Sequence, residues 1–234
     1  MRALFGLLAV LAFSAPALAD DTLSPLSFQS QGVFGSTDKA AAQRGFLVYQ
    51  TVCAACHAMG ALHYRDLEAL GISPNQVAGL AAGIKLPDGS PATLDDVFRD
   101  PHPSAAAFGG ALPPDLSDIV AQRPGGVWYV YGLLTGYAPA PAALSLLPSH
   151  YYNTEYPGNQ IAMPAPLKGN EVTYADGTAA TAPQEAADVT AFLDWAADPN
   201  LDARHEIGLR AVMFLVFLSI IAIATKRKIW REVL

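Results

Sequence analysis

The sequence has few cysteines and few basic residues, and each shortage excludes a class of protein. Two cysteines among 234 residues are too few for a disulfide framework or for a zinc site with four cysteine ligands. Residues 20–202 hold only 7 basic side chains against 19 acidic ones, a net charge of −12. A domain of that charge repels nucleic acid and attracts a basic protein partner. The chain also contains no internal repeat, no phosphate-binding loop and no arrangement of nucleophilic catalytic residues.

Charged residues are scarce as well, at 15% of the chain, and the mean hydropathy of +0.25 is high for a soluble protein. Part of the excess is an apolar run over residues 3–13, which follows Arg2 and is too short to span a bilayer. An Ala-Leu-Ala sequence ending at Ala19 then matches the small-x-small pattern of signal-peptidase sites. We therefore predict a cleaved secretory signal over residues 1–19. An uncleaved N-terminal anchor is the alternative.

A second apolar run covers residues 207–225 and predicts a transmembrane helix. At helical rise this run spans about 28 Å, close to the thickness of the hydrocarbon core. Its one charged residue, Arg210, can extend its guanidinium to the nearer interface. The basic tail, residues 226–234, is predicted in the cytoplasm and the domain of residues 20–206 on the other side. The signal peptide agrees, which predicts a single-pass protein of a bacterial-type inner membrane with a periplasmic domain.

Both cysteines belong to the sequence Cys53-Ala54-Ala55-Cys56-His57, the attachment pattern of a c-type haem. Two thiols three residues apart on a helical turn can each bond to one vinyl group of the porphyrin, and the adjacent histidine can bind the iron. A thioredoxin-like redox pair would need a βαβ pattern around it, and a zinc site would need a second ligand pair. The sequence therefore predicts one covalently bound haem c, attached at Cys53 and Cys56, with His57 as an axial ligand.

The second axial position decides between electron transfer and ligand binding, because an open position would admit gases or peroxide. Met1 leaves with the signal, and Met213 lies in the membrane helix. Met59 is too close to His57 in sequence to reach the opposite haem face. Met163 remains; prolines beside it restrict its backbone, and a core-filling role is its alternative. Competing ligands, each more readily explained as a solvated or capping histidine, are His63, His102 and His150.

Helical periodicity and helix punctuation predict the architecture of the exported domain. We expect two of the predicted helices, residues 40–58 and 184–197, to cross near the haem edge, with Gly45 permitting a close approach. Long stretches rich in proline and glycine, residues 83–115 and 136–170, are predicted to be irregular, and loops of that length usually build a site. The predicted fold class is all-α. The predicted helices are residues 40–58, 125–135 and 184–197.

Beyond the haem motif, the sequence resembles the cytochrome c1 family, whose members carry the haem of the cytochrome bc1 complex. The resemblance covers nearly the whole mature chain. Its most specific segments are the proline-proline-aspartate stretch 110–117 and the methionine context 161–164, and the aromatic stretch 129–137 also matches. Further matching segments are Phe34-Gly35, Arg44-Gly45-Phe46, Val48-Tyr49, Tyr64-Arg65, Tyr151-Tyr152-Asn153, Asp176-Gly177-Thr178, Asp188-Val189 and Lys226-Arg227.

The resemblance implies a cytochrome c-like haem domain with long irregular loops and one C-terminal transmembrane helix, with His57 and Met163 as axial ligands. The resemblance also implies that the chain works in a membrane complex with cytochrome b and the Rieske iron-sulfur protein. It accepts electrons from the Rieske protein and reduces a soluble cytochrome c, without a catalytic site of its own. The haem pocket would also include Tyr64, Arg65, Pro113 and Pro114.

One departure from the family concerns the haem propionates. Members usually carry an arginine in an Arg-Ala-x-Asn-type stretch before the Gly-Ala-Leu-Pro-Pro segment, and its side chain approaches a propionate. This chain has Ala-Ala-Ala-Phe-Gly there, at residues 105–109. The neutralising charge would then come from Arg65 or Arg99, or be weaker. We therefore expect a lower reduction potential than in members with the arginine.

Two other functions remain open at this point. One is a free-standing, membrane-tethered c-type cytochrome that carries or senses electrons outside any complex. The other is a haem enzyme, such as a peroxidase, with an exchangeable sixth ligand. Co-isolation with cytochrome b and a Rieske protein distinguishes the first from a complex subunit, and carbon monoxide binding by the reduced protein detects the second.

Overall fold

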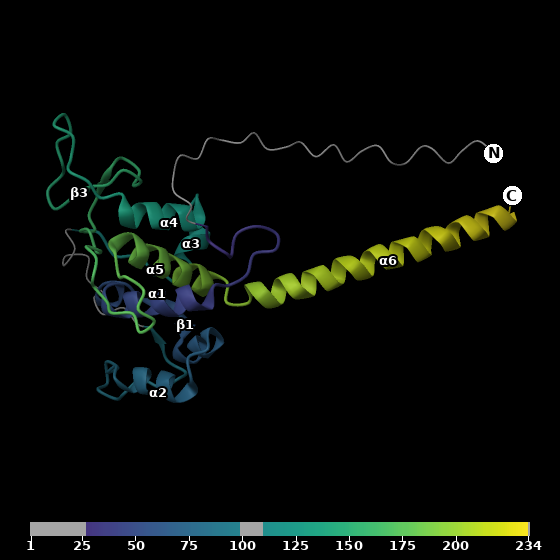
Figure 1. Cartoon of the computed structure of the whole chain (residues 1–234), viewed down its shortest axis with the longest axis horizontal. Helices are drawn as coiled ribbons and strands as arrows, with labels where there is room; N and C mark the ends of the chain where they lie inside the picture. The colour runs from purple at the N-terminus through teal and green to yellow at the C-terminus, as the bar shows by residue number, and fades with distance from the viewer. Residues whose placement is uncertain (1–26, 99–109, 234) are drawn as a thin grey trace.

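Two helices cross at the centre of the domain. The computed structural model describes residues 27–98 and 110–233, and within it α1 (Lys39–Thr51) packs along α5 (Ala182–Ala197) (Figure 1). The helices approach closely because Gly45 has no side chain: a Cβ there would lie 1.9 Å from the backbone oxygen of Asp188. The predicted role of Gly45 is therefore confirmed.

Both helices begin at residues that favour helix capping. The Asp38 carboxylate accepts a hydrogen bond from the Ala41 N–H at 3.0 Å, and the Thr181 hydroxyl accepts one from the Gln184 N–H at 3.3 Å. Pro183 lies in the first turn of α5, where a missing N–H leaves no helical hydrogen bond unmade. The third predicted helix is therefore confirmed, and it begins two residues earlier than expected.

Aromatic side chains fill the crossing. The ring of Phe192 in α5 is fully buried, and its centroid lies 5.5 Å from that of Phe46 and 5.6 Å from that of Tyr49 on α1. Phe98 packs edge-on against the same two α1 rings, at 6.2 and 5.9 Å. Rings of this size bury roughly 150–250 Å² each, so this cluster dominates the hydrophobic stabilisation of the domain.

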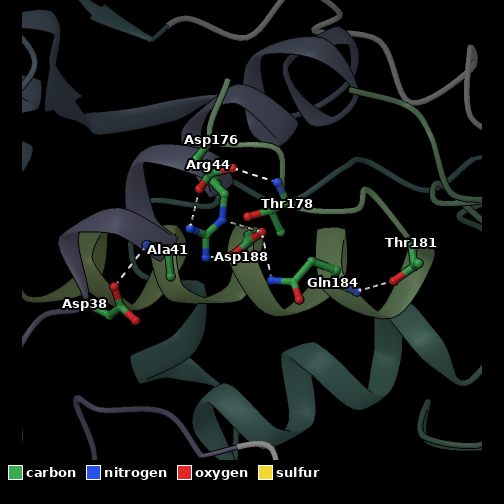
Figure 2. Close-up of polar contacts among 8 residues, drawn as sticks. All are labelled: Asp38, Ala41, Arg44, Asp176, Thr178, Thr181, Gln184 and Asp188. Atoms are coloured by element: carbon green, nitrogen blue, oxygen red, sulfur yellow. Dashed lines mark hydrogen bonds and ion pairs between the residues drawn. The ribbon is translucent and has the colours of Figure 1, made fainter. Parts of the chain in front are cut away.

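A charged cluster also joins the same two helices (Figure 2). Arg44 of α1 donates from Nη2 and Nε to the two carboxylate oxygens of Asp188 on α5, at 2.8 and 3.1 Å. Its Nη1 donates to Asp176 at 3.1 Å, and Gln184 donates to Asp188 at 3.1 Å. The Asp188 side chain is only 1% exposed. Because a buried carboxylate is costly unless it is paired, this cluster holds α1 and α5 in one register.

Shorter helices cover α5 on its other side. α4 (Gly126–Thr135) packs against α5, and α3 (Ile119–Gln122) contacts both helices (Figure 1). α4 follows Gly125, whose φ of +92° lies in the left-handed region that favours glycine. α4 confirms the helix predicted over residues 125–135.

Elements that periodicity did not predict complete the domain. The short helices η2 (Tyr64–Leu70) and α2 (Pro74–Ala82) pack together, and α2 has a capping box of Ser73 and Gln76. Two small antiparallel sheets are also present, each with two strands. The mainly helical class is confirmed. The described residues of the two stretches predicted as irregular contain no helix, but they include three short strands, so that prediction was wrong at those positions. The strands are β1 (Met59–His63) with β2 (Val97–Phe98), and β3 (Tyr151–Tyr152) with β4 (Gln160–Ile161).

The helix predicted over residues 40–58 was wrong in its second part. α1 ends at Thr51, with Val52 as its C-cap, and a separate 3₁₀ turn, η1 (Cys53–Ala55), follows. After that turn the chain extends into β1. Beyond His57 the chain does not return to a helix, because residues 58, 60 and 61 are hydrogen-bonded to a distant segment, residues 115–117.

The chain ends in a single long helix, α6 (Leu201–Val233), which leaves the domain (Figure 1). Among the described residues it is the one helix long and apolar enough to cross a membrane, with a mean hydropathy of 2.5 in its most apolar window. The predicted anchor of residues 207–225 lies inside it, and the basic residues continue the same helix. The predicted signal peptide of residues 1–19 lies outside the described residues, as do Arg99, His102 and residues 105–109.

Candidate haem site

The first cysteine, Cys53, begins the 3₁₀ turn η1, and the second, Cys56, follows it as the C-cap. The N–H groups of Cys56 and His57 both donate to the Cys53 carbonyl, at 3.0 and 2.9 Å. A 3₁₀ helix has three residues per turn, so side chains three positions apart lie on the same side. The turn therefore directs both thiols to one face, which is the requirement for bonding to two vinyl groups of one porphyrin.

The environment of Cys53 is that of a neutral thiol. Burial, with a smaller contribution from Cys56, raises the pKa of Cys53 to about 12. Redox-active pairs of the thioredoxin kind depend on a lowered thiol pKa, because the thiolate is the attacking species. This environment therefore does not favour thiol–disulfide exchange at Cys53.

His57 is oriented by a carbonyl group 57 positions along the chain. Its Nδ1 lies 2.8 Å from the backbone oxygen of Pro114. Because a carbonyl oxygen only accepts hydrogen bonds, Nδ1 must carry the proton and donate it. The lone pair is then on Nε2, the tautomer that a metal-binding histidine needs, and the hydrogen bond also increases the basicity of the ring. Tyr49 fixes the backbone of the same residue by donating from its hydroxyl to the His57 carbonyl at 3.1 Å.

The segment after His57 is held against the residues around Pro114 by three further hydrogen bonds. The Leu116 N–H donates to the Ala58 carbonyl at 2.9 Å. The Asp115 carboxylate accepts from the Gly60 N–H at 2.6 Å, and the Ser117 hydroxyl accepts from the Ala61 N–H at 3.0 Å. These bonds fix the position of the Pro114 carbonyl, and through it the orientation of the imidazole.

Met163 is held by a separate set of contacts. It lies two residues after β4, is half-buried, and accepts a hydrogen bond at its carbonyl from the Tyr137 hydroxyl at 3.0 Å. Tyr137 pairs with Asn153 in an antiparallel bridge. Asn153 is fully buried and donates to the Leu133 carbonyl at 2.8 Å. Its side-chain oxygen accepts from the N–H groups of Glu155 and Tyr156, which shapes the loop leading to Met163.

Tyr64 and Arg65, which the resemblance places in the haem pocket, begin η2. Tyr64 is 5% exposed, and its ring centroid lies 4.3 Å from that of Phe98, in the aromatic core. Arg65 forms an ion pair with Asp95, and both side chains are more than half exposed. Its guanidinium therefore has a carboxylate partner within the protein. Pro113 is half-buried, next to the Pro114 carbonyl that orients His57.

The competing methionine and histidines have structural roles. Met59 is fully buried in β1, in the hydrophobic core. His63 caps η2, where its N–H donates to the Asp66 carboxylate at 2.7 Å. His150 lies in a loop, with Nδ1 2.9 Å from the Pro148 carbonyl. The capping role, one of the two expected for a competing histidine, agrees with the structure at His63.

The donor groups fit a haem better than a bare metal ion. The described residues contain no group of three or more His, Cys, Asp or Glu side chains that could hold a metal by themselves. A porphyrin supplies four ligands to its iron, so the protein needs to contribute only one or two. One imidazole in the correct tautomer, two thiols on one face and a methionine sulfur match that requirement.

Comparison with known proteins agrees with this site. Residues 28–233 match the Cytochrome C1 family. Cytochrome c1 of Rhodospirillum rubrum is 39% identical over 264 residues, covering 99% of this chain and 97% of the relative. The chain belongs to the cytochrome c1 family. Two mitochondrial relatives, both described as heme proteins, are 38% identical: one from Arabidopsis thaliana over 98% of this chain and 80% of the relative, and one from Saccharomyces cerevisiae over 87% and 71%.

In this cytochrome c1 family member, the residues that hold His57 and Met163 in place were not predicted from the sequence. Asp115, Ser117, Tyr137 and Asn153 all lie in the segments that carry the family resemblance, but their hydrogen bonds join residues far apart in the chain. A cavity of about 150 Å³ lies elsewhere, between α1, α5 and residues 27–30, and its lining includes none of the predicted haem residues.

Proposed function

We propose that this chain binds one haem c, joined to Cys53 and Cys56, with iron between His57 Nε2 and the sulfur of Met163. The bound haem would supply reversible one-electron chemistry. His57 holds its proton at Nδ1 against the Pro114 carbonyl, which directs the other nitrogen to the iron. Tyr137 restricts the backbone of Met163, so the sulfur would need little rearrangement between oxidation states. Tyr64, Pro113 and Pro114 would line the pocket, and Arg65 would lie at its edge.

The function that these features support best is that of the haem-bearing subunit of a cytochrome bc1 complex. The single observation that carries this proposal is the match to the cytochrome c1 family over residues 28–233. In this role the chain accepts electrons from the Rieske iron-sulfur protein, reduces a soluble cytochrome c, and assembles with cytochrome b. It has no catalytic site of its own and contributes the electron-carrying step of the quinol:cytochrome c oxidoreductase.

We further propose a single-pass topology in a bacterial-type inner membrane. Residues 1–19 act as a secretory signal, residues 20–206 form the periplasmic haem domain, residues 207–225 cross the membrane and residues 226–234 lie in the cytoplasm. The apolar helix α6 and the basic residues at its far end support this topology. At the near end, Arg210 pairs with Glu206 one turn earlier, which keeps its charge at the interface.

The ligand assignment is tested with Met163→Leu, compared with Met59→Leu as a matched control. Both changes replace a thioether by an alkyl side chain, but Met59 is a core residue. The Met163 variant is expected to lose the low-spin spectrum and to bind carbon monoxide when reduced, whereas the Met59 variant and the parent protein keep the six-coordinate spectrum. An unchanged spectrum in the Met163 variant would exclude this ligand.

Membership of a complex is tested separately, by gentle detergent extraction of an affinity-tagged chain from its own membranes. Co-isolation of a cytochrome b and a Rieske protein, with quinol-dependent reduction of cytochrome c, is the expected result. A chain that purifies alone, with an intact haem spectrum, would contradict the complex and indicate a free-standing carrier.

A further inference from the structure

The loop before α1 carries an exposed apolar tip. Val33 is 81% exposed and Phe34 is 84% exposed, more than any other large apolar side chain that the structure describes, those of α6 included. The tip is a tight turn, because the Gly35 N–H donates to the Gly32 carbonyl at 3.1 Å. Gly32 has a φ of +90°, and a Cβ on Gly35 would lie 2.0 Å from the Ser30 carbonyl oxygen. The turn is therefore a defined structure that holds the two apolar side chains outward.

This loop is fastened to the first turns of the membrane helix. The carbonyl of Gly35 lies 2.7 Å from His205 Nδ1, which donates to it, and the Thr37 N–H donates to the Asp202 carboxylate at 2.9 Å. His205 is only two residues before the apolar run that begins at Ile207. Figure 1 shows the purple loop projecting from the domain on the same side from which α6 leaves. The tip is thus held close to the level at which α6 enters the membrane.

The size and charge of the loop favour a lipid surface over a protein partner. Residues 29–37 contain no charged residue, so entry into the interfacial region desolvates no ion. A stable protein interface buries about 800 Å² on each partner, far more than two side chains can cover. Two apolar side chains at the end of a rigid turn are instead sufficient for shallow insertion, in the manner of other interfacial anchors.

We propose that Val33 and Phe34 insert into the headgroup and acyl-chain boundary of the leaflet on the domain's side, as a second membrane contact beside α6. The inference rests on the membrane placement of α6 proposed above. One helix alone would let the domain tilt about its point of entry. A second contact, linked to the helix through His205 and Asp202, fixes that tilt and therefore the orientation of the haem domain relative to the membrane.

Photocrosslinking in native membranes tests this proposal. The full chain is prepared with Phe34→p-benzoylphenylalanine, and separately with the same replacement at Leu147. Leu147 is also exposed, at 57%, and belongs to the loop before β3. Figure 1 shows β3 at the end of the domain away from α6. After irradiation, mass spectrometry of the modified peptide is expected to show addition of a phospholipid at position 34 and none at position 147.

Two results would overturn the loop insertion: a position-34 product formed only with another protein, or the absence of a lipid product at that position. Extraction of the same membranes with alkaline carbonate separates this failure from failure of the topology. If the chain remains in the membrane but position 34 gives no lipid product, only the insertion is wrong. If carbonate releases the chain, the membrane placement of α6 is wrong as well.

Discussion

Tyr137 and Met163, 26 positions apart, are joined by a hydrogen bond of 3.0 Å from the phenol hydroxyl to the backbone carbonyl. Burial raises the pKa of Tyr137, so the hydroxyl remains protonated and continues to donate throughout the physiological pH range. Tyr137 follows directly after α4 and also pairs with the buried Asn153. The proposed ligand sulfur is therefore placed by a helix end and a buried amide, and not by its own loop alone.

Replacing this hydroxyl should loosen the proposed iron–sulfur bond. Tyr137→Phe is expected to lower the free energy of unfolding by about 1 kcal/mol, the typical net value of one hydrogen bond. It should also lower the pH at which the methionine is displaced from the oxidised haem, followed by the long-wavelength absorption of sulfur-ligated ferric haem. Tyr151→Phe, at an exposed β3 position, serves as the control. Equal behaviour of the two variants would contradict a positioning role for Tyr137.

The buried side-chain amide of Asn153 should contribute more to stability than the Tyr137 hydroxyl does. Asn153→Leu keeps the size of the side chain but removes the partners of one carbonyl and two N–H groups in a site with no solvent access. Each unsatisfied group costs about 1–3 kcal/mol, so we expect a loss of about 3 kcal/mol or more in chemical denaturation. Asn75→Leu, at an exposed position of α2, should change stability by less than about 0.5 kcal/mol. A similar small change at both positions would show that the Asn153 network is not important for stability.

The acidic surface predicts a strong dependence on salt. Residues 20–202 carry a net charge of −12, which should steer a basic cytochrome c to the domain. Reduction of cytochrome c by the reduced chain, measured by stopped flow, is expected to slow by about 10-fold or more as ionic strength rises from low to high values. Oxidation by an uncharged small molecule should stay constant over the same range. If both rates respond alike, electrostatic docking is not the cause.

The elements that could be predicted from sequence are those determined by local chemistry. α4 and α5 follow from periodicity and from Pro183, and the haem motif follows from five consecutive residues. α2 was not predicted but could have been, because Ser73 followed by a proline and then Gln76 is a helix-start signature. Each of these signals acts within a few residues of the chain.

Features that depend on distant contacts could not be predicted in this way. The sequence predicts a helix through residue 58, but α1 ends at Thr51 and a 3₁₀ turn follows, and the chain beyond His57 is hydrogen-bonded to the distant residues 115–117. The pairing of His57 with the Pro114 carbonyl has the same origin, since no spacing rule relates positions 57 residues apart. The ion pair between Arg65 and Asp95, which lie 30 positions apart, could not be predicted from sequence for the same reason.

Stability should depend on pH through Glu185. Burial raises the pKa of this carboxyl, partly offset by the Glu171 and Val172 N–H groups that donate to it. Because the pKa of Glu185 is higher in the folded state, its protonated form contributes to stability. That contribution is complete below the unfolded pKa of about 4.3 and is lost as pH rises through the folded pKa. The parent protein should therefore lose stability over that window relative to Glu185→Gln.

Urea denaturation at a series of pH values measures this difference. The gap in unfolding free energy between Glu185→Gln and the parent should grow in favour of the variant as pH rises, and then become constant. Glu68→Gln, at an exposed position of η2, should give no such growth. A gap at Glu185 that does not change with pH would mean that the carboxyl titrates alike in the folded and unfolded chain.

The ion pair between Arg44 and Asp188 should be one of the few that contribute strongly to stability. Most surface pairs are worth about 0–1 kcal/mol, but removing one partner of a buried pair costs about 3–5 kcal/mol, because a charge stays behind without compensation. Arg44→Met would leave the 1%-exposed Asp188 carboxylate hydrogen-bonded to the Gln184 amide but without its guanidinium partner. We expect a loss near the lower end of that range, since the Arg44 side chain is itself 21% exposed.

A double-mutant cycle isolates the contribution of this pair. Arg204→Met is the matched control, because Arg204 is 65% exposed and pairs with Asp198 at the surface; it should cost at most about 1 kcal/mol. Adding Asp188→Leu to Arg44→Met removes the stranded carboxylate and should restore part of the lost stability, although each change alone is destabilising. If Arg44→Met costs no more than Arg204→Met, and the double variant is additive, the two helices are held together by their aromatic contacts and not by this pair.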